Sequence, residues 1–320
     1  MKYNYSLIKI IKDLKLAYKK IKLANDELPA FKVLMKALSI SMGEAQKLID
    51  KKRLFCDEIL VTQKNQILKG KIELIVYENA PLGEKPIFDN QNLAIFDKKS
   101  GVLSHPNGRN CPYSLSDEIW HLYGKEACVA HRLDRETSGL ILVAKNKKTQ
   151  IVLKTMFEKR QIQKEYLALV QGKTPLEFEV NVPLALGKDY DEFKTRMRIC
   201  PLSDGGKEAY TEFKRLEFFE DLNASLVLAR PLTGRQHQIR LHLFHMKHKI
   251  LGESLYGLEK AQIESILDKK ISPIDRVKLT GAKRLCLHSH RLVFEFGGEK
   301  FDIVSPKEMR AEFLSAVLCK

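Results

Sequence analysis

From residue 93 onwards, short apolar runs bounded by polar or turn-forming residues recur along the chain and predict strands. They lie at residues 93–96, 127–130, 140–144, 166–170, 209–213, 225–229, 285–288, 292–296 and 301–304. Apolar positions at helical spacing are fewer and lie at residues 148–160, 236–246, 258–267 and 307–318. Many strands with few helices between them predict an α+β fold whose sheet is mixed and largely antiparallel.

Residues 30–78 predict a separate, small α+β domain. Apolar residues recur at helical spacing around Phe31 and again around Ala45. Ser41 is placed to cap the second of these helices, and Glu44 three residues later completes a capping box. Strand-like runs follow at residues 54–56, 59–62 and 72–76.

The segment before this domain is strongly basic. Seven lysines precede Ala24 and are interspersed with leucine and isoleucine, which predicts a basic amphipathic helix over residues 1–29. We expect this helix to pack against its neighbour, and an RNA-binding arm is the alternative. Residues 79–92 are rich in Pro, Gly, Asn and charge and predict a linker, so residues 93–320 form one large domain.

The composition favours a polyanionic partner. The 55 Lys and Arg residues exceed the 40 Asp and Glu residues, which gives a formal net charge of +15. Nucleic acid is the first candidate and an anionic membrane surface the second. The six cysteines form no CxxC pair, which suits a reducing cytoplasm, and no stretch is long and apolar enough to span a bilayer.

The most specific segment is residues 131–145, which have the sequence HRLDRETSGLILVAK. Asp134 lies between Arg132 and Arg135 in a polar break between two apolar runs. Two strands joined by this loop would hold the carboxylate at a surface, and the flanking guanidinium groups would keep it ionised, as a nucleophile or base requires. The alternative is an ordinary surface ion pair with no chemical role.

This segment resembles the second motif of the RluA-type pseudouridine synthases, HRLDxxTSGxxxxAK, at every fixed position, including His131 and Thr137. The resemblance implies that Asp134 is the catalytic residue and that the enzyme needs no cofactor. It also implies that Arg132 fills the place left by a uridine that has flipped out of its stack.

Two further segments resemble motifs of the same family. Residues 97–106, DKKSGVLSHP, are similar to KPxGxxxHP, with Lys99 in place of the proline. The resemblance implies a mostly structural segment near the active-site loop, with His105 as a substrate contact and a general base as the alternative. Residues 164–172, KEYLALVQG, are similar to KxYxAxxxG, which implies that Tyr166 stacks on the target base. A tyrosine buried in the core is the alternative.

Residues 233–242, TGRQHQIRLH, resemble the third motif, GRxHQIRxH. Arg235 and Arg240 are five residues apart, about 140° around a helix, so they cannot face the same point. The resemblance assigns the ion pair with Asp134 to Arg240, with Arg235 as the alternative, which would otherwise contact RNA. Further along, Glu253 stands where the family usually has aspartate, and residues 285–292 resemble a late LHAxxL strand.

Four histidines are close together in sequence, at positions 237, 242, 245 and 248. Their spacing matches no paired metal signature, so we predict no metal and interpret them as surface histidines near RNA, with His237 in contact with it. The chain also has no dinucleotide fingerprint and no phosphate-binding Gly-Lys loop.

The interpretation that follows is an RNA pseudouridine synthase, monomeric and cytoplasmic, that acts on ribosomal or transfer RNA and not at a membrane. Asp134 could add to the base, attack C1′ or remove the C2′ proton, and the sequence leaves these routes open. Residues 30–78 weakly resemble the alpha-L RNA-binding module, although Met42 replaces its usual basic residue. The alternatives are a non-catalytic RNA-binding or ribosome-assembly factor, and a hydrolase that pairs Asp134 with Glu136.

Overall fold

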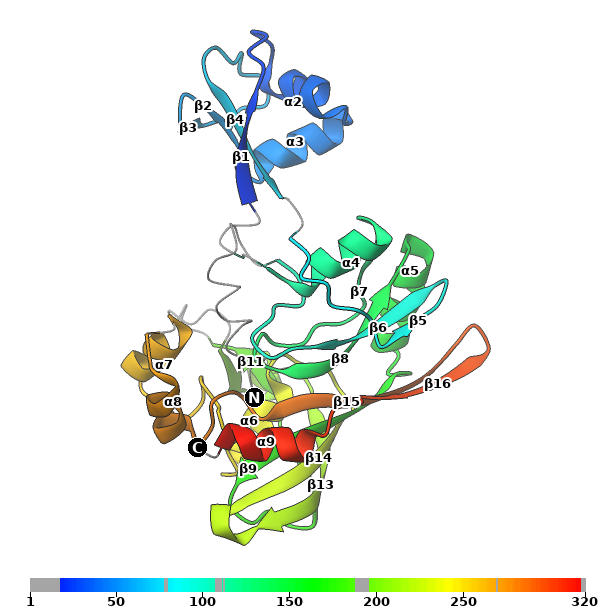
Figure 1. Ribbon diagram of the computed structural model, residues 1–320, viewed down its shortest axis with the longest axis vertical. Helices are drawn as coiled ribbons and strands as arrows, with labels where there is room; N and C mark the ends of the chain where they lie inside the picture. Colours follow the sequence, from blue (N-terminus) through cyan, green and yellow to red (C-terminus); the bar gives the residue numbers. More distant parts are fainter. Residues whose placement is uncertain are drawn as a thin grey trace. The chain divides into compact units, whose positions relative to one another are not determined.

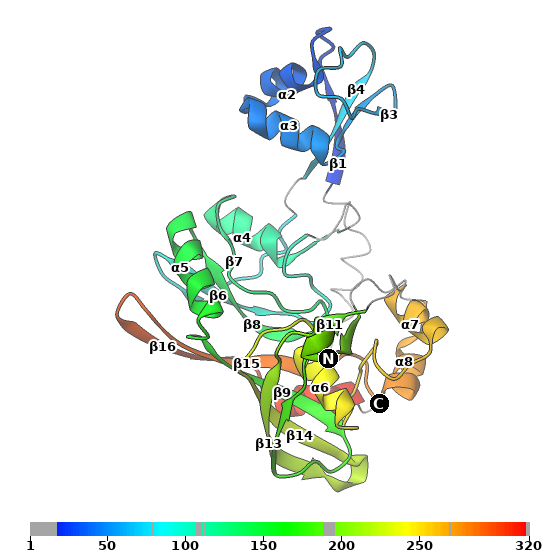
Figure 2. The same cartoon turned by 180° about the vertical axis from the view of Figure 1, so that it is seen from behind.

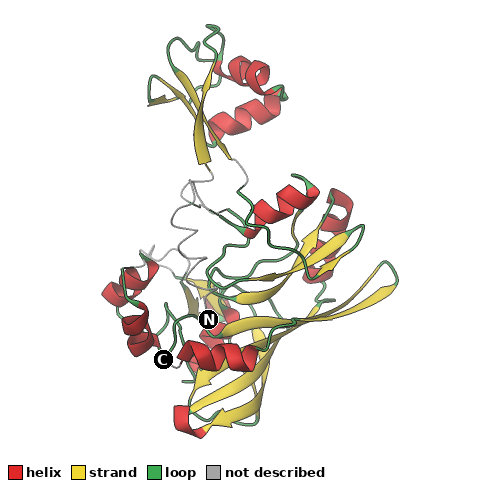
Figure 3. Cartoon of the chain, viewed as in Figure 1, coloured by secondary structure: helices red, strands yellow, loops and turns green. Residues whose placement is uncertain are grey.

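The structure is a computed structural model that describes residues 18–77, 80–106, 111, 113–187, 196–268 and 270–317. The chain divides into two compact units (Figures 1 and 3). The first comprises the chain up to Gly83 together with His105–His121, and the second comprises Glu84–Ser104 and Leu122–Lys320. No helix within the described ranges has the length and hydropathy needed to cross a bilayer.

The first unit packs two helices on a four-stranded sheet of order β1-β4-β2-β3. Its elements are β1 (Tyr18–Leu23), α2 (Ala30–Leu38), α3 (Met42–Asp50), β2 (Leu54–Cys56), β3 (Ile59–Leu60) and β4 (Ile72–Tyr77). The capping box at the start of α3 is present, with Ser41 and Glu44 exchanging hydrogen bonds. A core that includes Leu34, Ile49 and Leu74 joins both helices to the sheet.

The predicted N-terminal helix is wrong where the structure describes it. Tyr18–Leu23 forms β1, which pairs antiparallel with β4, and no helix covers residues 24–29. Ile21 and Leu23 pack on the core while Lys20 and Lys22 are exposed, so the period is two and not 3.6. Residues 1–17 lie outside the described residues.

The boundaries of the second unit also differ from the prediction. Part of the expected linker forms β5 (Phe88–Asp89), which pairs with β6 (Leu93–Lys98). In addition, most of α4 (Leu115–Tyr123) groups with the first unit, because its carboxylates bind that part of the chain. Asp117 accepts from Tyr77 Oη at 2.7 Å and from Ala80 N at 3.0 Å.

A ten-stranded sheet of order β10-β13-β14-β9-β15-β8-β6-β5 forms the second unit, with β16 beside β15 and β7 beside β8. Its other strands are β7 (Cys128–Val129), β8 (Ser138–Ala144), β9 (Gln163–Gln171), β10 (Glu177–Asn181), β13 (Tyr210–Phe219), β14 (Ala224–Pro231), β15 (Leu287–Phe296) and β16 (Glu299–Val304). Every pairing is antiparallel except β8 with β15, which confirms the predicted mixed, largely antiparallel sheet. β11 (Leu184–Leu186) and β12 (Met197–Ile199) pair separately.

The parallel contact between β8 and β15 depends on a glycine. Ser289 lies opposite Gly139, whose φ is +110°. A Cβ at Gly139 would lie 2.2 Å from the carbonyl oxygen of Ser289, so only glycine permits this approach. β15 thereby joins β8 on one side to β9 on the other, and it also merges two strands that the sequence predicted separately.

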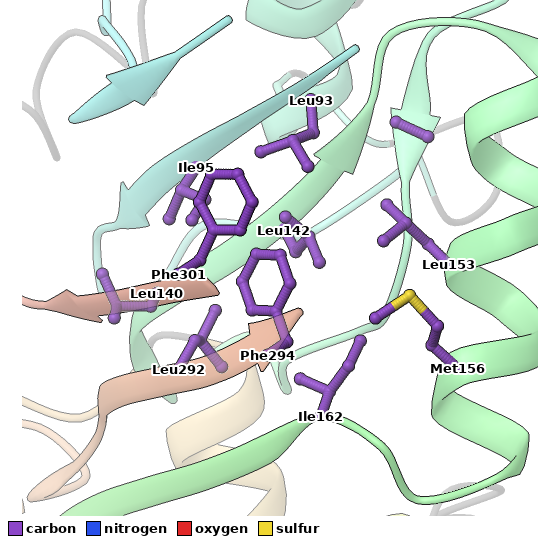
Figure 4. Close-up of a cluster of buried hydrophobic side chains, with 11 residues drawn as sticks. Leu93, Ile95, Leu140, Leu142, Leu153, Met156, Ile162, Leu292, Phe294 and Phe301 are labelled. Atoms are coloured by element: carbon purple, nitrogen blue, oxygen red, sulfur yellow. The ribbon is translucent and has the colours of Figure 1, made fainter. Parts of the chain in front are cut away.

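The helices of this unit pack around the sheet, with α6 in front of its strands in Figure 2. They are α5 (Lys147–Glu158), α6 (Gln238–His245), α7 (Lys260–Leu267), α8 (Pro273–Thr280) and α9 (Met309–Val317), with short 3-10 turns at Leu202–Asp204 and Glu220–Leu222. Leu153 and Met156 of α5 pack over the aromatic residues Phe294 and Phe301 of β15 and β16 (Figure 4). This core makes the strands beside residues 131–137 rigid.

Candidate active site

Asp134 lies in the loop that connects β7 to β8. The Thr137 N–H donates to the Asp134 carbonyl at 3.2 Å and closes a turn. The segment before residue 105 holds the same loop, since Ser104 Oγ donates to the Leu133 carbonyl at 2.9 Å and Ser100 Oγ to the Glu136 carbonyl at 2.7 Å. Hydrogen bonds therefore fix the loop, while the side chain of Asp134 remains 25% exposed.

Arg240 of α6 is the arginine that pairs with Asp134. Its Nη1 donates to Asp134 Oδ2 at 3.1 Å, while Nε and Nη2 donate to the two carboxylate oxygens of Glu253 at 2.8 and 2.6 Å. The bidentate contact fixes the guanidinium plane. Burial alone would lower the pKa of Arg240, but the charge and hydrogen bond of Glu253, together with the charges of Asp134 and Glu136, outweigh it and raise that pKa. Arg235 is directed elsewhere, with Nε donating to the Glu208 carbonyl at 2.9 Å.

His237 lies against both Asp134 and the aromatic residue Tyr256. Its Nε2 is 3.6 Å from Asp134 Oδ2, and its Nδ1 is 3.0 Å from Tyr256 Oη. The backbone of His237 is left-handed, with φ at +53°, at the residue before α6. Burial lowers the pKa of His237 to about 4, so the imidazole is neutral near pH 7.

Asp134 is ionised in this environment. Burial alone would raise its pKa, but the positive charges of His237, Arg240 and Lys98 and the hydrogen bond from Arg240 lower it. Since His237 is neutral above pH about 4, Arg240 is the charge that matters most near pH 7. The residues flanking Asp134 in sequence are not its partners: Arg132 is exposed, and neither it nor Arg135 makes a side-chain ion pair with any residue that the structure describes. Our prediction that these two arginines keep Asp134 ionised is therefore wrong.

Lys98, at the end of β6, is a site residue that the sequence analysis missed. It is 1% exposed, and its Nζ donates to the carbonyls of Lys99, Val102 and Arg135 at 3.1, 2.8 and 3.2 Å. Burial lowers its pKa to about 7, against the attraction of Asp134. The available signal was its place at the first position of the segment that resembles KPxGxxxHP, two residues after the predicted apolar strand.

Tyr166 is near the start of β9, between β14 and β15. Its Cα partners are Ala229 and Ser289, and its side chain is 9% exposed. Burial and the negative charge of Asp134 raise the pKa of Tyr166 to about 12, so the phenol remains protonated near pH 7. The ring is thus close enough to Asp134 to respond to its charge.

Two other predicted residues have structural contacts. His131 Nε2 accepts the Leu142 N–H at 3.1 Å, and burial lowers the pKa of His131 to about 3. Thr137 is buried and closes the turn at Asp134. His105 groups with the first unit, and its predicted role stays a prediction.

The histidine cluster is dispersed in the structure. His242 contacts Thr211 Oγ1 at 3.0 Å, and His248 contacts the Gln171 carbonyl at 2.9 Å. Contrary to the prediction of surface histidines, His237 and His242 are buried. Across the described ranges, no group of three or more His, Cys, Asp or Glu residues is arranged to hold a metal.

Glu136 is engaged in a separate buried network. Ser254 Oγ donates to one carboxylate oxygen at 2.6 Å, and Arg276 Nη2 donates to the other at 2.7 Å. Burial would raise the pKa of Glu136, but Arg276 and these hydrogen bonds lower it. A carboxylate that stays ionised cannot serve as the acid of a hydrolase, so this geometry disfavours pairing Asp134 with Glu136.

The chain is similar to known RNA pseudouridine synthases. The family model for RNA pseudouridylate synthase matches residues 92–245. The chain is 36% identical over 274 residues to an uncharacterized RNA pseudouridine synthase of Helicobacter pylori, covering 85% of this chain and 90% of the relative. It is 30% identical over 241 residues to ribosomal large subunit pseudouridine synthase D of Zymomonas mobilis, covering 71% of each.

Among solved structures, the human RNA pseudouridylate synthase domain containing 4 aligns with a TM-score of 0.55. The alignment covers 72% of this chain and 92% of the human chain at 22% identity, which shows a shared fold.

Proposed function

The chain belongs to the RluA-type RNA pseudouridine synthases, and we propose that Asp134 is its reactive group, acting on a flipped uridine of ribosomal or transfer RNA. The enzyme is an isomerase that converts uridine to pseudouridine. The ion pair between Arg240 Nη1 and Asp134 Oδ2, at 3.1 Å, is the observation that carries this proposal. It gives an ionised carboxylate at a partly exposed position on a loop with a rigid support.

The reaction needs little beyond such a carboxylate. The N1–C1′ bond breaks, the base rotates, and C5 joins C1′ while C5 loses a proton and N1 gains one. No electrons are gained or lost, and no group is transferred from another molecule. Asp134 could add to the base, attack C1′ or take the C2′ proton, and each of these routes requires the ionised form that Arg240 supports.

Two other residues have proposed roles at the base. Tyr166 is the stacking partner, supported by its position on β9 within electrostatic range of Asp134. Arg132 takes the place of the flipped nucleotide, supported by its exposed side chain two residues before Asp134. In this scheme the histidine at position 237 contributes a neutral imidazole beside the carboxylate.

The proposed substrate is RNA of the ribosome, with transfer RNA as the other candidate. The formal net charge of +15 supports binding to a polyanion. The Zymomonas mobilis relative is named for the large ribosomal subunit. We also propose that the first unit contributes to RNA binding, because Lys19, Lys20 and Lys22 are all exposed along β1.

Pseudouridine mapping in cells tests both the choice of RNA substrate and the role of Asp134. Sites in ribosomal and transfer RNA that disappear when the gene is deleted should return with the wild-type protein and not with Asp134→Asn. The asparagine keeps the shape of the side chain and removes its charge, so folding and RNA binding should be nearly unchanged. Restoration of the modification by Asp134→Asn would overturn the assignment of Asp134.

A further inference from the structure

We infer that Arg276 of α8 is a positioning residue for the reaction, because it holds Glu136, two residues after Asp134, in a buried ion pair. This inference rests on the proposed role of Asp134 as the reactive group. Neither Arg276 nor α8 belongs to a motif that the sequence analysis singled out. The residue would act on substrate only through the loop that carries Asp134.

The contacts around Glu136 occupy its whole carboxylate. Arg276 Nη2 donates to Oε1 at 2.7 Å, and Ser254 Oγ donates to Oε2 at 2.6 Å. The side chain of Glu136 is 13% exposed and that of Arg276 is 17% exposed. Within the described residues, Glu136 is the only carboxylate paired with Arg276, whose Nη2 also lies 3.5 Å from the Gly252 carbonyl.

Glu136 is built into the turn that presents Asp134. Its carbonyl accepts from Ser100 Oγ at 2.7 Å, and the next residue, Thr137, donates its N–H to the Asp134 carbonyl at 3.2 Å. With its side chain fixed on one side and its backbone on the other, Glu136 has little freedom to move. The orientation of Asp134 therefore depends on the anchor of Glu136.

Two adjacent residues connect this network to the ion pair of Asp134. Glu253 holds Arg240, which donates to Asp134, while Ser254 holds Glu136. Arg276 binds Glu136 together with Ser254, and it supplies the positive charge that a buried Glu136 carboxylate requires. Without that charge, Glu136 would be drawn towards water and the turn would move with it. Displacements of about 1 Å at a reacting group can reduce rates about 100-fold.

A double-mutant cycle on the full-length protein tests the inference. The variants are Arg276→Met, Glu136→Gln and the double variant, with Arg276→Lys as the charge-conserving substitution. Lys278→Met is the matched control, because it removes a cation of the same helix whose side chain is 75% exposed. Single-turnover release of tritium from [5-³H]uridine in a transcript of the mapped site measures the maximal rate and the enzyme concentration that gives half of it.

Each single variant should lower the maximal rate about 10- to 100-fold with the half-saturating concentration unchanged, since the loss concerns positioning and not RNA binding. The double variant should be no slower than the slower single variant, because both remove one interaction. Arg276→Lys should recover part of the rate, and Lys278→Met should keep the wild-type rate.

Multiplicative losses in the double variant would overturn the inference, as would an unchanged maximal rate in Arg276→Met. If Arg276→Met does not fold, a wild-type rate in Glu136→Gln overturns it equally. Asp134→Asn in parallel separates the two proposals. An active Asp134→Asn removes the proposed function, whereas an inactive one beside fully active Arg276 and Glu136 variants removes this inference alone.

Discussion

Arg240 and Asp134 are 106 positions apart in the sequence, yet Arg240 Nη1 lies 3.1 Å from Asp134 Oδ2. The other two nitrogens of the guanidinium are held by Glu253, which is fully buried. The arginine thus links a carboxylate that contributes only to structure with one that is open to substrate. Under the proposed role of Asp134, we expect stability and activity to depend on the same arginine side chain.

Replacing Arg240 should therefore damage both properties. Arg240→Gln leaves Glu253 buried without its cation, and loss of one partner of a buried pair costs about 3–5 kcal/mol. Urea denaturation should show this decrease in the free energy of unfolding, and tritium release should be lost. Arg235→Gln is the control, because among the described residues the Arg235 side chain donates to the Glu208 carbonyl and pairs with no carboxylate. Similar destabilisation by the two substitutions would contradict the assigned ion pair.

Arg132 should show the opposite behaviour. Its side chain is exposed and has no ion pair in the described part of the chain, so Arg132→Ala should change the free energy of unfolding by less than about 0.5 kcal/mol. Activity should nevertheless fall at least about ten-fold, because the flipped base loses its replacement. Lys154→Ala, which removes a 75% exposed cation from α5, is the control for net charge. Equal activities of the two variants would contradict the proposal that Arg132 takes the place of the flipped nucleotide.

The stability of the protein should decrease as the pH falls below about 6.5. The pKa of His131 is lowered to about 3, so between pH 3 and 6.5 the unfolded chain binds a proton that the native state does not. Such a group lowers the free energy of unfolding by up to about 1.4 kcal/mol per pH unit in that window. His242 and His288, with pKa values lowered by burial to about 4 and about 3, act in the same direction.

His131→Gln should reduce this dependence on pH. The glutamine oxygen can accept the Leu142 N–H in place of Nε2 but cannot take up the proton. Chemical denaturation at pH 7.5 and pH 5 measures the slope for each protein. Equal slopes for the variant and the wild type would show that His131 is not the neutral acceptor described above.

Gly139→Ala should be strongly destabilising. The new Cβ would lie 2.2 Å from the Ser289 carbonyl oxygen, in addition to the strain of a positive φ. Gly298→Ala separates the two effects, because Gly298 also has a positive φ, +83°, but a Cβ there would have no atom within 4 Å. We expect about 1 kcal/mol from the φ alone and at least about 2 kcal/mol more at Gly139. Equal thermal unfolding temperatures for the two variants would disprove the close approach.

Most of the strands could be predicted, because a strand that is buried in the sheet is encoded by a run of apolar residues. β15 was predicted as two strands, at residues 285–288 and 292–296, since Ser289, His290 and Arg291 interrupt its apolar pattern, although Ser289 is fully buried. α8 was missed because few apolar residues mark it and Ile274 is 60% exposed, even though Ser272 caps it. The segment that forms β1 was predicted as a helix, because its closely spaced lysines fit both the helical period of 3.6 residues and the strand period of two.

The site was predictable only as far as its motifs extend. The motifs located Asp134 and Arg240 on segments that the fold then brings together. The motif position of Lys98 was a signal, but its buried contact could not be predicted, because one acceptor, the Arg135 carbonyl, belongs to a distant segment of the chain. Adjacency in sequence suggested Arg135 as a partner of Asp134, whereas electrostatics in the folded protein depend on distance through space.

The central position of β15 determines when during synthesis the enzyme can become active. β8, which follows the loop that carries Asp134, and β9, which carries Tyr166, both pair with β15 and not directly with each other. A ribosome has therefore made most of the chain before the two halves of the sheet can be joined. Such long-range pairing is slow to form. Until it forms, Asp134 and Tyr166 of the nascent protein are not yet held together in one sheet. Newly made enzyme should first act on RNA only after β15 has emerged and paired.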